Sequence, residues 1–275
     1  MASPIDGGTV VVTGASSGIG RDIAREIAPR AKRIVLVARR KERLEALARE
    51  LKEANGKLEV DVYAVDLADR TAVKAFAEQA AREVGEVDVL VNNAGLGDIG
   101  MFDKSSLEKQ LFMIDLNIVG LVALTHAFLP GMIARKRGAI LMVSSGFGFS
   151  FLPGFAGYIG TKHFVTGFTE SLRLEAAGTG VRIGQVCPGP VATEFEENIG
   201  NFTGMKAPGF LELSSAACAK ACVRAIDWNR ALVVPHLLIA FLLLFARYSP
   251  RWLVRIVLWP AGRRMRRMQE ASSAG

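Results

Sequence analysis

Cysteine and histidine are scarce in this chain of 275 residues, which contains three of each. An odd number of cysteines without a CxxC pair or a histidine cluster argues against both a disulfide framework and a zinc site. The histidines have no partners at a spacing that suits a catalytic triad, and packing or surface roles are expected for them. We therefore expect no metal. The residues concerned are Cys187, Cys218, Cys222, His126, His163 and His236.

The chain also lacks an evenly spread excess of charge, although its formal net charge is +7. Seven arginines and a single acid, Glu270, lie from Arg247 to the end, so the preceding residues are nearly neutral. A nearly neutral body disfavours a nucleic-acid partner. Residues 1–8 lack a basic start followed by an apolar stretch. Without this pattern of a secretory signal, we expect a cytoplasmic protein.

Short β-branched runs alternate with helical segments, which predicts an α/β fold with a doubly wound parallel sheet, Rossmann-like, in a single domain. The predicted strands are Thr9–Thr13, Arg33–Ala38, Glu59–Val65, Val87–Asn92, Ala139–Ser144, Arg182–Pro188 and Ala231–Val234, which makes the sheet seven-stranded. The predicted helices are Gly18–Ala28, Lys41–Ala54, Arg70–Val84, Leu107–Arg135, Tyr158–Ala177 and Ser215–Trp228. We expect this domain to cover residues 1–235, and a helical extension to cover residues 236–275.

Three glycines lie between the first predicted strand and the first helix, at positions 14, 18 and 20. Glycines permit a tight turn and close backbone approach, and the helix amino terminus attracts an anion, so this turn suits a pyrophosphate. A glycine trio alone is weak evidence, because ordinary strand-to-helix loops are also rich in glycine. Its place at the start of a βαβ pattern strengthens the interpretation.

The string Thr13-Gly14-Ala15-Ser16-Ser17-Gly18-Ile19-Gly20 resembles the cofactor fingerprint of the short-chain dehydrogenase/reductase family. Further motifs of that family follow in order: Asn92-Asn93-Ala94-Gly95, Asn117, Ser144-Ser145, Tyr158-x-x-x-Lys162 and Pro188-Gly189-Pro190-Val191-x-Thr193. The resemblance covers residues 8–235 and implies a nicotinamide dinucleotide cofactor. By resemblance its ligands would be Gly14, Ser16, Ser17, Gly18, Ile19, Gly20, Asp66, Leu67, Asn92, Ala94, Tyr158, Lys162, Pro188, Gly189, Val191 and Thr193.

The residues after the second predicted strand indicate which dinucleotide is used. NAD-selective enzymes place an acid there, whereas an arginine accommodates the 2′-phosphate of NADP. Here Arg39 and Arg40 stand at this point, with Arg43 one turn later. We predict NADP(H), with Arg39 as the phosphate ligand and Arg40 beside it. Alternatively, Arg39, Arg40 and Arg43 form a solvated helix face with Glu42 and Glu45.

Tyr158 and Lys162 are four residues apart and so share one face of a helix. Tyrosine has a pKa of about 10, and a neighbouring ammonium together with a positive nicotinamide favours the phenolate. We predict Tyr158 as the general acid/base, tuned by Lys162. Ser145 would donate to the substrate oxygen, with Ser144 as a structural neighbour. Asn117 is either a core amide or, by resemblance, a catalytic residue that fixes a water for a proton relay to Lys162.

Aromatic residues cluster near this set. Four lie in the nine residues from Phe147 to Phe155, either as core filling or as a substrate wall. A glycine-spaced stretch after Thr193, with Phe195, Phe202, Met205 and Phe210, predicts a mobile apolar lid. We expect Phe147, Phe155 and Phe195 to contact a hydrophobic substrate together with Ser145 and Tyr158.

The extension begins with an apolar segment that starts as a helix near His236 and ends at Ala246. Such a helix is about 16 Å long, well short of a ~30 Å hydrocarbon core, so it is not expected to span a membrane. The following arginines and aromatics suit peripheral contact of residues 236–267 with an anionic membrane. Equally, the apolar pieces could cover the substrate mouth or form a dimer contact, with the arginines merely solvated.

These features predict an NADPH-dependent oxidoreductase that interconverts a carbonyl and a secondary alcohol on a hydrophobic substrate, such as a 3-oxoacyl lipid or a steroid. An isomerase or epimerase that uses the same cofactor is an alternative. Another is a non-catalytic dinucleotide-sensing or scaffolding protein, against which the complete set Asn117, Ser145, Tyr158 and Lys162 argues. The family resemblance also implies a homodimer or homotetramer.

Overall fold

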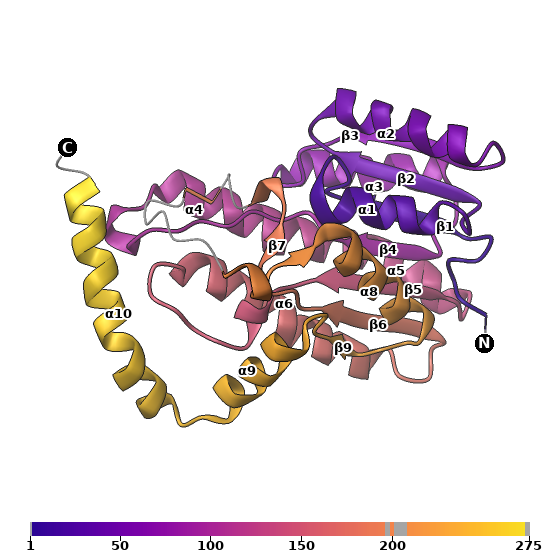
Figure 1. Cartoon of the computed structure of the whole chain (residues 1–275). Helices are drawn as coiled ribbons and strands as arrows, with labels where there is room; N and C mark the ends of the chain where they lie inside the picture. The colour runs from indigo at the N-terminus through magenta and orange to yellow at the C-terminus, as the bar shows by residue number, and fades with distance from the viewer. Residues whose placement is uncertain (1, 196–198, 201–207, 273–275) are drawn as a thin grey trace.

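The computed structural model describes residues 2–195, 199–200 and 208–272 (Figure 1). In these residues a parallel sheet of seven strands has the order β3-β2-β1-β4-β5-β6-β9. Its strands are β1 (Thr9–Thr13), β2 (Arg33–Ala38), β3 (Glu59–Ala64), β4 (Val89–Asn92), β5 (Gly138–Val143), β6 (Val181–Val186) and β9 (Leu232–Val233). The predicted fold class is confirmed, and each predicted strand boundary lies within two residues of the observed one.

Helices cover both faces of the sheet. On one face lie α1 (Gly18–Ile27), α2 (Lys41–Ala54) and α8 (Ser215–Asp227), and on the other α3 (Arg70–Glu83), α5 (Leu121–Ala134) and α6 (Ala156–Glu175). Because neighbouring strand residues point to opposite faces, Val10 and Val12 enter one core while Val11 enters the other. This two-sided burial explains the continuous apolar runs of the strands.

The predicted helix Leu107–Arg135 is interrupted at its centre by a π-helical segment. It consists of α4 (Leu107–Ile114), a π-helical segment (Asp115–Gly120) and α5. A π turn in a helix often marks a functional position, and Asn117 lies within this one. The stretch Leu107–Ala134 is long and apolar enough to cross a membrane by length and composition. Here Leu121, Leu124 and Met132 are buried in the core beside the sheet.

Two short strands were not predicted. β7 (Val191–Ala192) pairs in parallel with β8 (Leu213–Ser214), directly before α8. Ser214 caps α8 by accepting a hydrogen bond from the backbone N–H of Ala217, at 3.2 Å. Strands of two residues carry no alternating pattern, so sequence periodicity cannot reveal them. This pairing fixes the end of the loop that follows β6.

The extension forms two helices, α9 (Leu237–Tyr248) and α10 (Arg251–Ser272), with an angle of 116° at the break between them. His236 caps α9 through Nδ1, which accepts from the backbone of Ile239, and Pro250 precedes α10. Taken together, these two bent helices are also long and apolar enough to cross a membrane. Figure 1 shows α10 crossing the end of the molecule toward which the strands point.

Candidate active site

Hydrogen bonds connect the glycine-rich turn to the residues that follow β4. Thr13 Oγ1 accepts hydrogen bonds from the backbone of Asn93 (2.9 Å) and Ala94 (3.0 Å). Asn93 Nδ2 donates to the carbonyl of Thr13, at 2.9 Å. Gly14 has a φ of +66°, and a Cβ there would lie 2.8 Å from Asn93 Nδ2, so this position requires glycine. Sequence reasoning left Thr13 and Asn93 out of the site, although both stand in its motifs.

The amino terminus of α1 suits an anion. Ser17 occupies the N-cap position in an extended conformation, yet its hydroxyl makes no capping hydrogen bond, and the first turn contains no acid. Backbone N–H groups at such a helix start favour a phosphate. Gly18, with a φ of +53°, and Gly20 belong to the same turn, as does Ile19. These residues fit the pyrophosphate of a dinucleotide.

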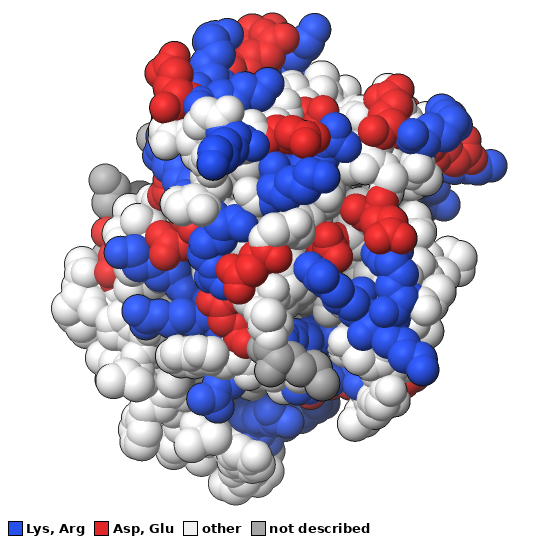
Figure 2. Space-filling view, turned by 90° about the vertical axis from the view of Figure 1, so that its right-hand side faces the viewer, with Lys and Arg blue, Asp and Glu red and all other residues white. Residues whose placement is uncertain are grey.

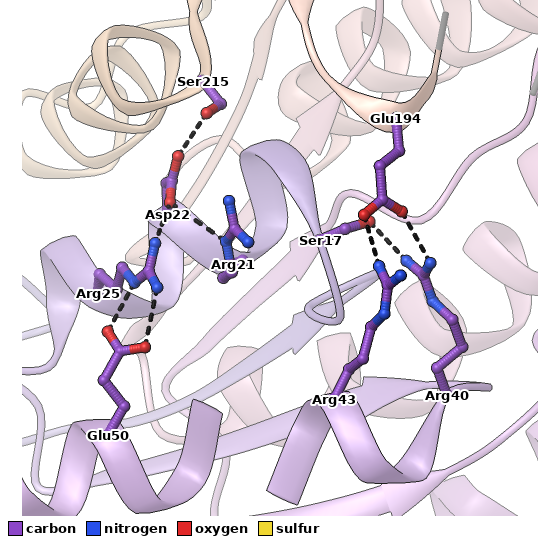
Figure 3. A network of polar contacts seen from close by, with 9 residues as sticks. All are labelled: Ser17, Arg21, Asp22, Arg25, Arg40, Arg43, Glu50, Glu194 and Ser215. Carbon is purple, nitrogen blue, oxygen red and sulfur yellow. Dashed lines mark hydrogen bonds and ion pairs between the residues drawn. The ribbon is translucent and has the colours of Figure 1, made fainter. Parts of the chain in front are cut away.

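Basic side chains border this turn (Figure 3). Arg40 Nη2 donates to Ser17 Oγ at 2.7 Å and to Ser16 Oγ at 3.1 Å. Both Arg40 and Arg43 bind the Glu194 carboxylate, at 2.8 and 2.5 Å, and their hydrogen bonds lower the pKa of Glu194. Arg39 lies apart, with its guanidinium 5.3 Å from the centroid of the Phe112 ring. In this structure Arg40, rather than Arg39, contacts the turn.

Three further predicted cofactor residues, Asn92, Asp66 and Leu67, lie at or just after the ends of strands. Asn92 is buried, and its amide donates to Thr125 Oγ1 at 3.0 Å and Met142 Sδ at 3.3 Å, which ties β4 to α5 and β5. This side chain is directed into the core, in contrast to that of Asn93. Asp66 lies two residues after β3, where its carboxylate accepts a hydrogen bond from the backbone of Ala68, and the adjacent Leu67 is buried.

Tyr158 and Lys162 lie on α6 and are both buried. Lys162 Nζ is 5.7 Å from the centroid of the Tyr158 ring and donates to the Val143 carbonyl at 3.1 Å. Burial raises the pKa of Tyr158 to about 12, an effect that a hydrogen bond with Ser145 partly opposes. Burial lowers the pKa of Lys162 to about 8. The structure therefore gathers the predicted tyrosine, lysine and serine in one cluster, in which Tyr158 and Lys162 are buried and Ser145 is partly exposed.

Asn117 completes this cluster from the π-helical segment. Its Nδ2 donates to the carbonyl of Leu96 (2.8 Å) and to Thr161 Oγ1 (3.0 Å), while Oδ1 accepts from the backbone of Leu96 (2.8 Å). A Cβ on Gly95 would lie 3.3 Å from Asn117 Oδ1 and 3.6 Å from Lys162 Nζ, so both side chains approach this glycine. Ser144 is buried, with its hydroxyl 3.2 Å from Thr166 Oγ1, as a structural neighbour would be.

Comparisons with known proteins agree with this geometry, since residues 8–203 match the family described as short chain dehydrogenase. The chain belongs to this family. It is 39% identical over 193 residues to human dehydrogenase/reductase SDR family member 7, which covers 69% of the chain but 57% of that protein. It is also 39% identical over 196 residues to the NADP-dependent 3-hydroxy acid dehydrogenase of Schizosaccharomyces pombe, covering 70% of the chain and 75% of the relative.

A solved short-chain dehydrogenase from Sphingobium yanoikuyae, in complex with NADPH, superposes with a TM-score of 0.78 at 32% identity. The superposition covers 85% of this chain and 89% of the other. Our chain is thus an oxidoreductase of the short-chain dehydrogenase family, with a site that suits a nicotinamide dinucleotide. Among the described residues, no group of three or more His, Cys, Asp or Glu side chains could hold a metal ion.

Aromatic rings surround the tyrosine of this short-chain dehydrogenase. The ring centroids of Phe147 and Phe195 lie 6.0 and 5.7 Å from that of Tyr158, and Phe155 lies 5.0 Å from Phe147. Phe210, in contrast, is exposed. Phe202 and Met205, the other members of the predicted lid, lie outside the described residues.

The turn after β6 joins the cofactor side of the site to the extension. Thr193 lies against Gly18, where a Cβ would come within 3.1 Å of Thr193 Cγ2. Val191 is buried in β7, and the Pro188 carbonyl accepts from the backbone of Gly146 at 2.8 Å. Gly189 packs against the side chain of Ile239 in α9. Sequence reasoning left open whether the apolar pieces cover the substrate mouth, and it did not name this turn as their contact.

Proposed function

We propose that the protein is an NADP(H)-dependent oxidoreductase that interconverts a carbonyl and a secondary alcohol on a hydrophobic substrate. The observation that supports this most is the environment of the Tyr158 side chain. Its hydroxyl has Ser145 as a hydrogen-bond partner, while Phe147 and Phe195 border its ring. A polar pair within an apolar aromatic wall suits a substrate with one reactive oxygen on an apolar body.

Arginine placement supports NADP(H) over NAD(H). Arg40 and Arg43 already converge on one carboxylate, that of Glu194, so their guanidinium groups can form an anion site. We propose that this pair, with Ser16, binds the 2′-phosphate, and that Arg39 leaves the Phe112 ring to join them. The relatives named for NADP dependence and solved with NADPH support the same choice.

The residues around Tyr158 would divide the chemistry of carbonyl reduction. When bound, the nicotinamide supplies the hydride that the carbonyl carbon accepts. Tyr158 donates its hydroxyl proton to the carbonyl oxygen, which gains negative charge as the carbon is reduced. Ser145 donates a hydrogen bond to the same oxygen and stabilises that charge. In the reverse direction Tyr158 takes the proton from the alcohol.

Lys162 and Asn117 would restore the proton that Tyr158 has donated. Lys162 lies on the same helix face as Tyr158, and its lowered pKa of about 8 lets the ammonium release a proton near neutral pH. Asn117 approaches Gly95, as does Lys162, and we propose that its amide positions a water between the ammonium and solvent. Lys162 would also hold the nicotinamide ribose.

We propose an apolar substrate of the size of a 3-oxoacyl lipid or a steroid. The relative from S. pombe is named for a 3-hydroxy acid, and binding of a carboxylate calls for a cation beside the reactive oxygen. Apart from Lys162, to which we assign the proton relay, the side chains that contact the Tyr158 ring in this chain are the phenylalanines Phe147 and Phe195. Dispersion and burial of apolar surface would therefore supply most of the binding energy.

The Tyr158→Phe substitution tests catalysis directly, because it removes the proton donor and keeps the ring. We expect it to abolish NADPH oxidation with an aromatic ketone while NADPH binding, followed by fluorescence, persists. Equal turnover of both proteins would disprove the role of Tyr158. Tight NADPH binding without turnover of any ketone by the unmodified protein would favour the non-catalytic sensor.

A further inference from the structure

Helix α9 has one apolar face directed at the candidate site. Ile239 and Leu243, one turn apart, pack on two glycines of the site loops. A Cβ on Gly189 would lie 3.0 Å from Ile239 Cγ1, and one on Gly146 would lie 3.1 Å from Leu243 Cδ1. Since Gly146 directly follows Ser145, the inner face of α9 forms a wall beside the catalytic serine.

The opposite face of α9 is apolar as well, and it is exposed. Within the described chain no residue of α9 is buried, and Phe241 and Phe245 are each 66% exposed. Leu237, Leu244 and Tyr248 share this outward face, which follows from their spacing on a helix. Monomeric soluble proteins rarely expose a contiguous apolar face of this kind, so a partner is indicated.

The first half of α10 continues the exposed apolar surface. Trp252, Ile256, Val257 and Trp259 are all exposed, with Ile256 at 62%. We call residues 237–259, on both sides of the 116° bend, the elbow. By length α9 covers about 18 Å and cannot cross a ~30 Å hydrocarbon core by itself. The bend of 116° also keeps α9 and α10 from forming one straight span, so the elbow is suited to lie in an interface.

Basic residues follow the elbow. Arg263, Arg264 and Arg267 are exposed in the second half of α10, while the sequence from Arg247 to its end contains one acid. The side of the molecule away from α10 differs, because basic and acidic side chains alternate across it (Figure 2). Apolar and aromatic side chains beside arginines complement the headgroup region of an anionic membrane.

The rest of α10 is attached to two loops beside the candidate site. Arg266 binds the Asp103 carboxylate through two hydrogen bonds of 2.9 Å, and Gln269 Oε1 accepts from the backbone of Met101 at 2.7 Å. Met265 packs on Gly154, one residue before Phe155. A surface that binds the elbow would therefore lie next to the loops that surround the substrate.

We propose that the elbow docks on an anionic membrane surface, with Arg263, Arg264 and Arg267 at the headgroups, and that the membrane supplies the apolar substrate to the mouth beneath α9. This inference rests on the proposed function for the substrate, whereas the docking itself rests on the exposed side chains alone. A second copy of the elbow fits less well, because a two-fold contact would bring like charges together.

The test is flotation of the full-length protein with vesicles of phosphatidylglycerol and phosphatidylcholine (1:1), compared with vesicles of phosphatidylcholine alone. We expect binding to the anionic vesicles only. The double substitution Phe241→Ser and Ile256→Ser should lower the partition coefficient at least about tenfold. Replacing Arg263, Arg264 and Arg267 with glutamine should remove the preference for anionic lipid. The matched control is Leu174→Ser, which removes a 78% exposed leucine from α6 and should change nothing.

Turnover distinguishes failure of the docking from failure of the proposed function. We expect the double variant to reduce a dissolved ketone as the unmodified protein does, but to reduce a vesicle-embedded ketone several-fold more slowly. Absence of flotation, or equal flotation of the double variant, overturns the docking proposal whatever the turnover. A dimer that the double variant converts to a monomer, without vesicle binding, overturns it in favour of a second copy. Vesicle binding without turnover of any ketone would leave the docking intact and contradict the proposed oxidoreductase.

Discussion

Arg40 and Glu194 form an ion pair of 2.8 Å between the start of α2 and the segment that follows β7. Arg43 binds the other oxygen of the same carboxylate. If this arginine pair is the site of the 2′-phosphate, Glu194 and NADPH compete for it. Glu194→Gln should then lower the Kd for NADPH about twofold to fivefold, since exposed ion pairs contribute up to about 1 kcal/mol, and leave the Kd for NADH unchanged.

A neighbouring pair supplies the control for this prediction. Glu50 binds Arg25 in the same network, at 2.7 Å, but away from the glycine-rich turn (Figure 3). Glu50→Gln should leave both dissociation constants unchanged. Titration of nucleotide fluorescence measures all four values. An unchanged NADPH affinity in Glu194→Gln would show that the carboxylate and the phosphate do not share the arginines.

Lys162→Met should stabilise the ligand-free protein at neutral pH. Burial holds the pKa of Lys162 at about 8, below its ordinary value of 10.5, so the unfolded chain binds more protons between these pH values. Stability therefore rises with pH through this window, and the burial cost is fully present below pH 8. After subtraction of the hydrogen bond to Val143, the gain at pH 7 is on the order of 2 kcal/mol.

Urea unfolding of both proteins at pH 7 and pH 10 measures this difference. The advantage of the methionine variant should shrink as pH rises, because the lysine of the folded protein is then already neutral. If the two proteins differ in unfolding free energy by the same amount at both pH values, burial does not lower the pKa of Lys162. NADPH oxidation by the variant should be lost at every pH.

The pH dependence of alcohol oxidation reports on Tyr158. Burial raises the pKa of this tyrosine to about 12, so the phenolate that accepts the alcohol proton increases with pH throughout the neutral and alkaline range. We expect kcat/KM for oxidation to rise from pH 7 to pH 10, and kcat/KM for ketone reduction to show no such rise. Oxidation that slows with increasing pH, in protein that remains folded by circular dichroism, would contradict this assignment.

Phe195→Ala should weaken binding of bulky ketones selectively. Its ring lies 5.7 Å from that of Tyr158, so its removal takes apolar contact away from the substrate position. We expect KM for a bulky aromatic ketone to rise about tenfold, with a smaller change for acetone. Phe210→Ala is the control, because the Phe210 side chain is 70% exposed. The same KM change for both ketones would remove Phe195 from the substrate wall.

The strands and the motif order could be predicted because each depends on neighbouring residues. Apolar β-branched runs mark strands that are buried on both faces, and glycine, asparagine and serine motifs stand at their carboxyl ends. The orientation of single side chains was harder to infer. Asn92 and Asn93 are adjacent and chemically identical, yet one is directed into the core and the other to the glycine-rich turn. Strand alternation separates them only once the strand end is known.

The features that sequence did not reveal depend on distant contacts. Arg39 and Arg40 could not be told apart before Ser17 and Glu194 were seen beside Arg40. The place of α9 follows from its contacts with Gly146 and Gly189, far away in sequence. Because α9 is apolar on nearly all sides, periodicity gave no face for it to bury. Homo-oligomer formation stays a prediction.

Turnover across a ketone series tests the central claim most directly. NADPH oxidation by the full-length protein would be followed with ketones from acetone to aromatic, long-chain and steroidal ones, with Tyr158→Phe as the reference. We predict that kcat/KM rises with apolar size and that Tyr158→Phe abolishes turnover of every ketone. Turnover confined to small polar ketones would contradict the hydrophobic substrate, and turnover that survives in Tyr158→Phe would contradict the mechanism.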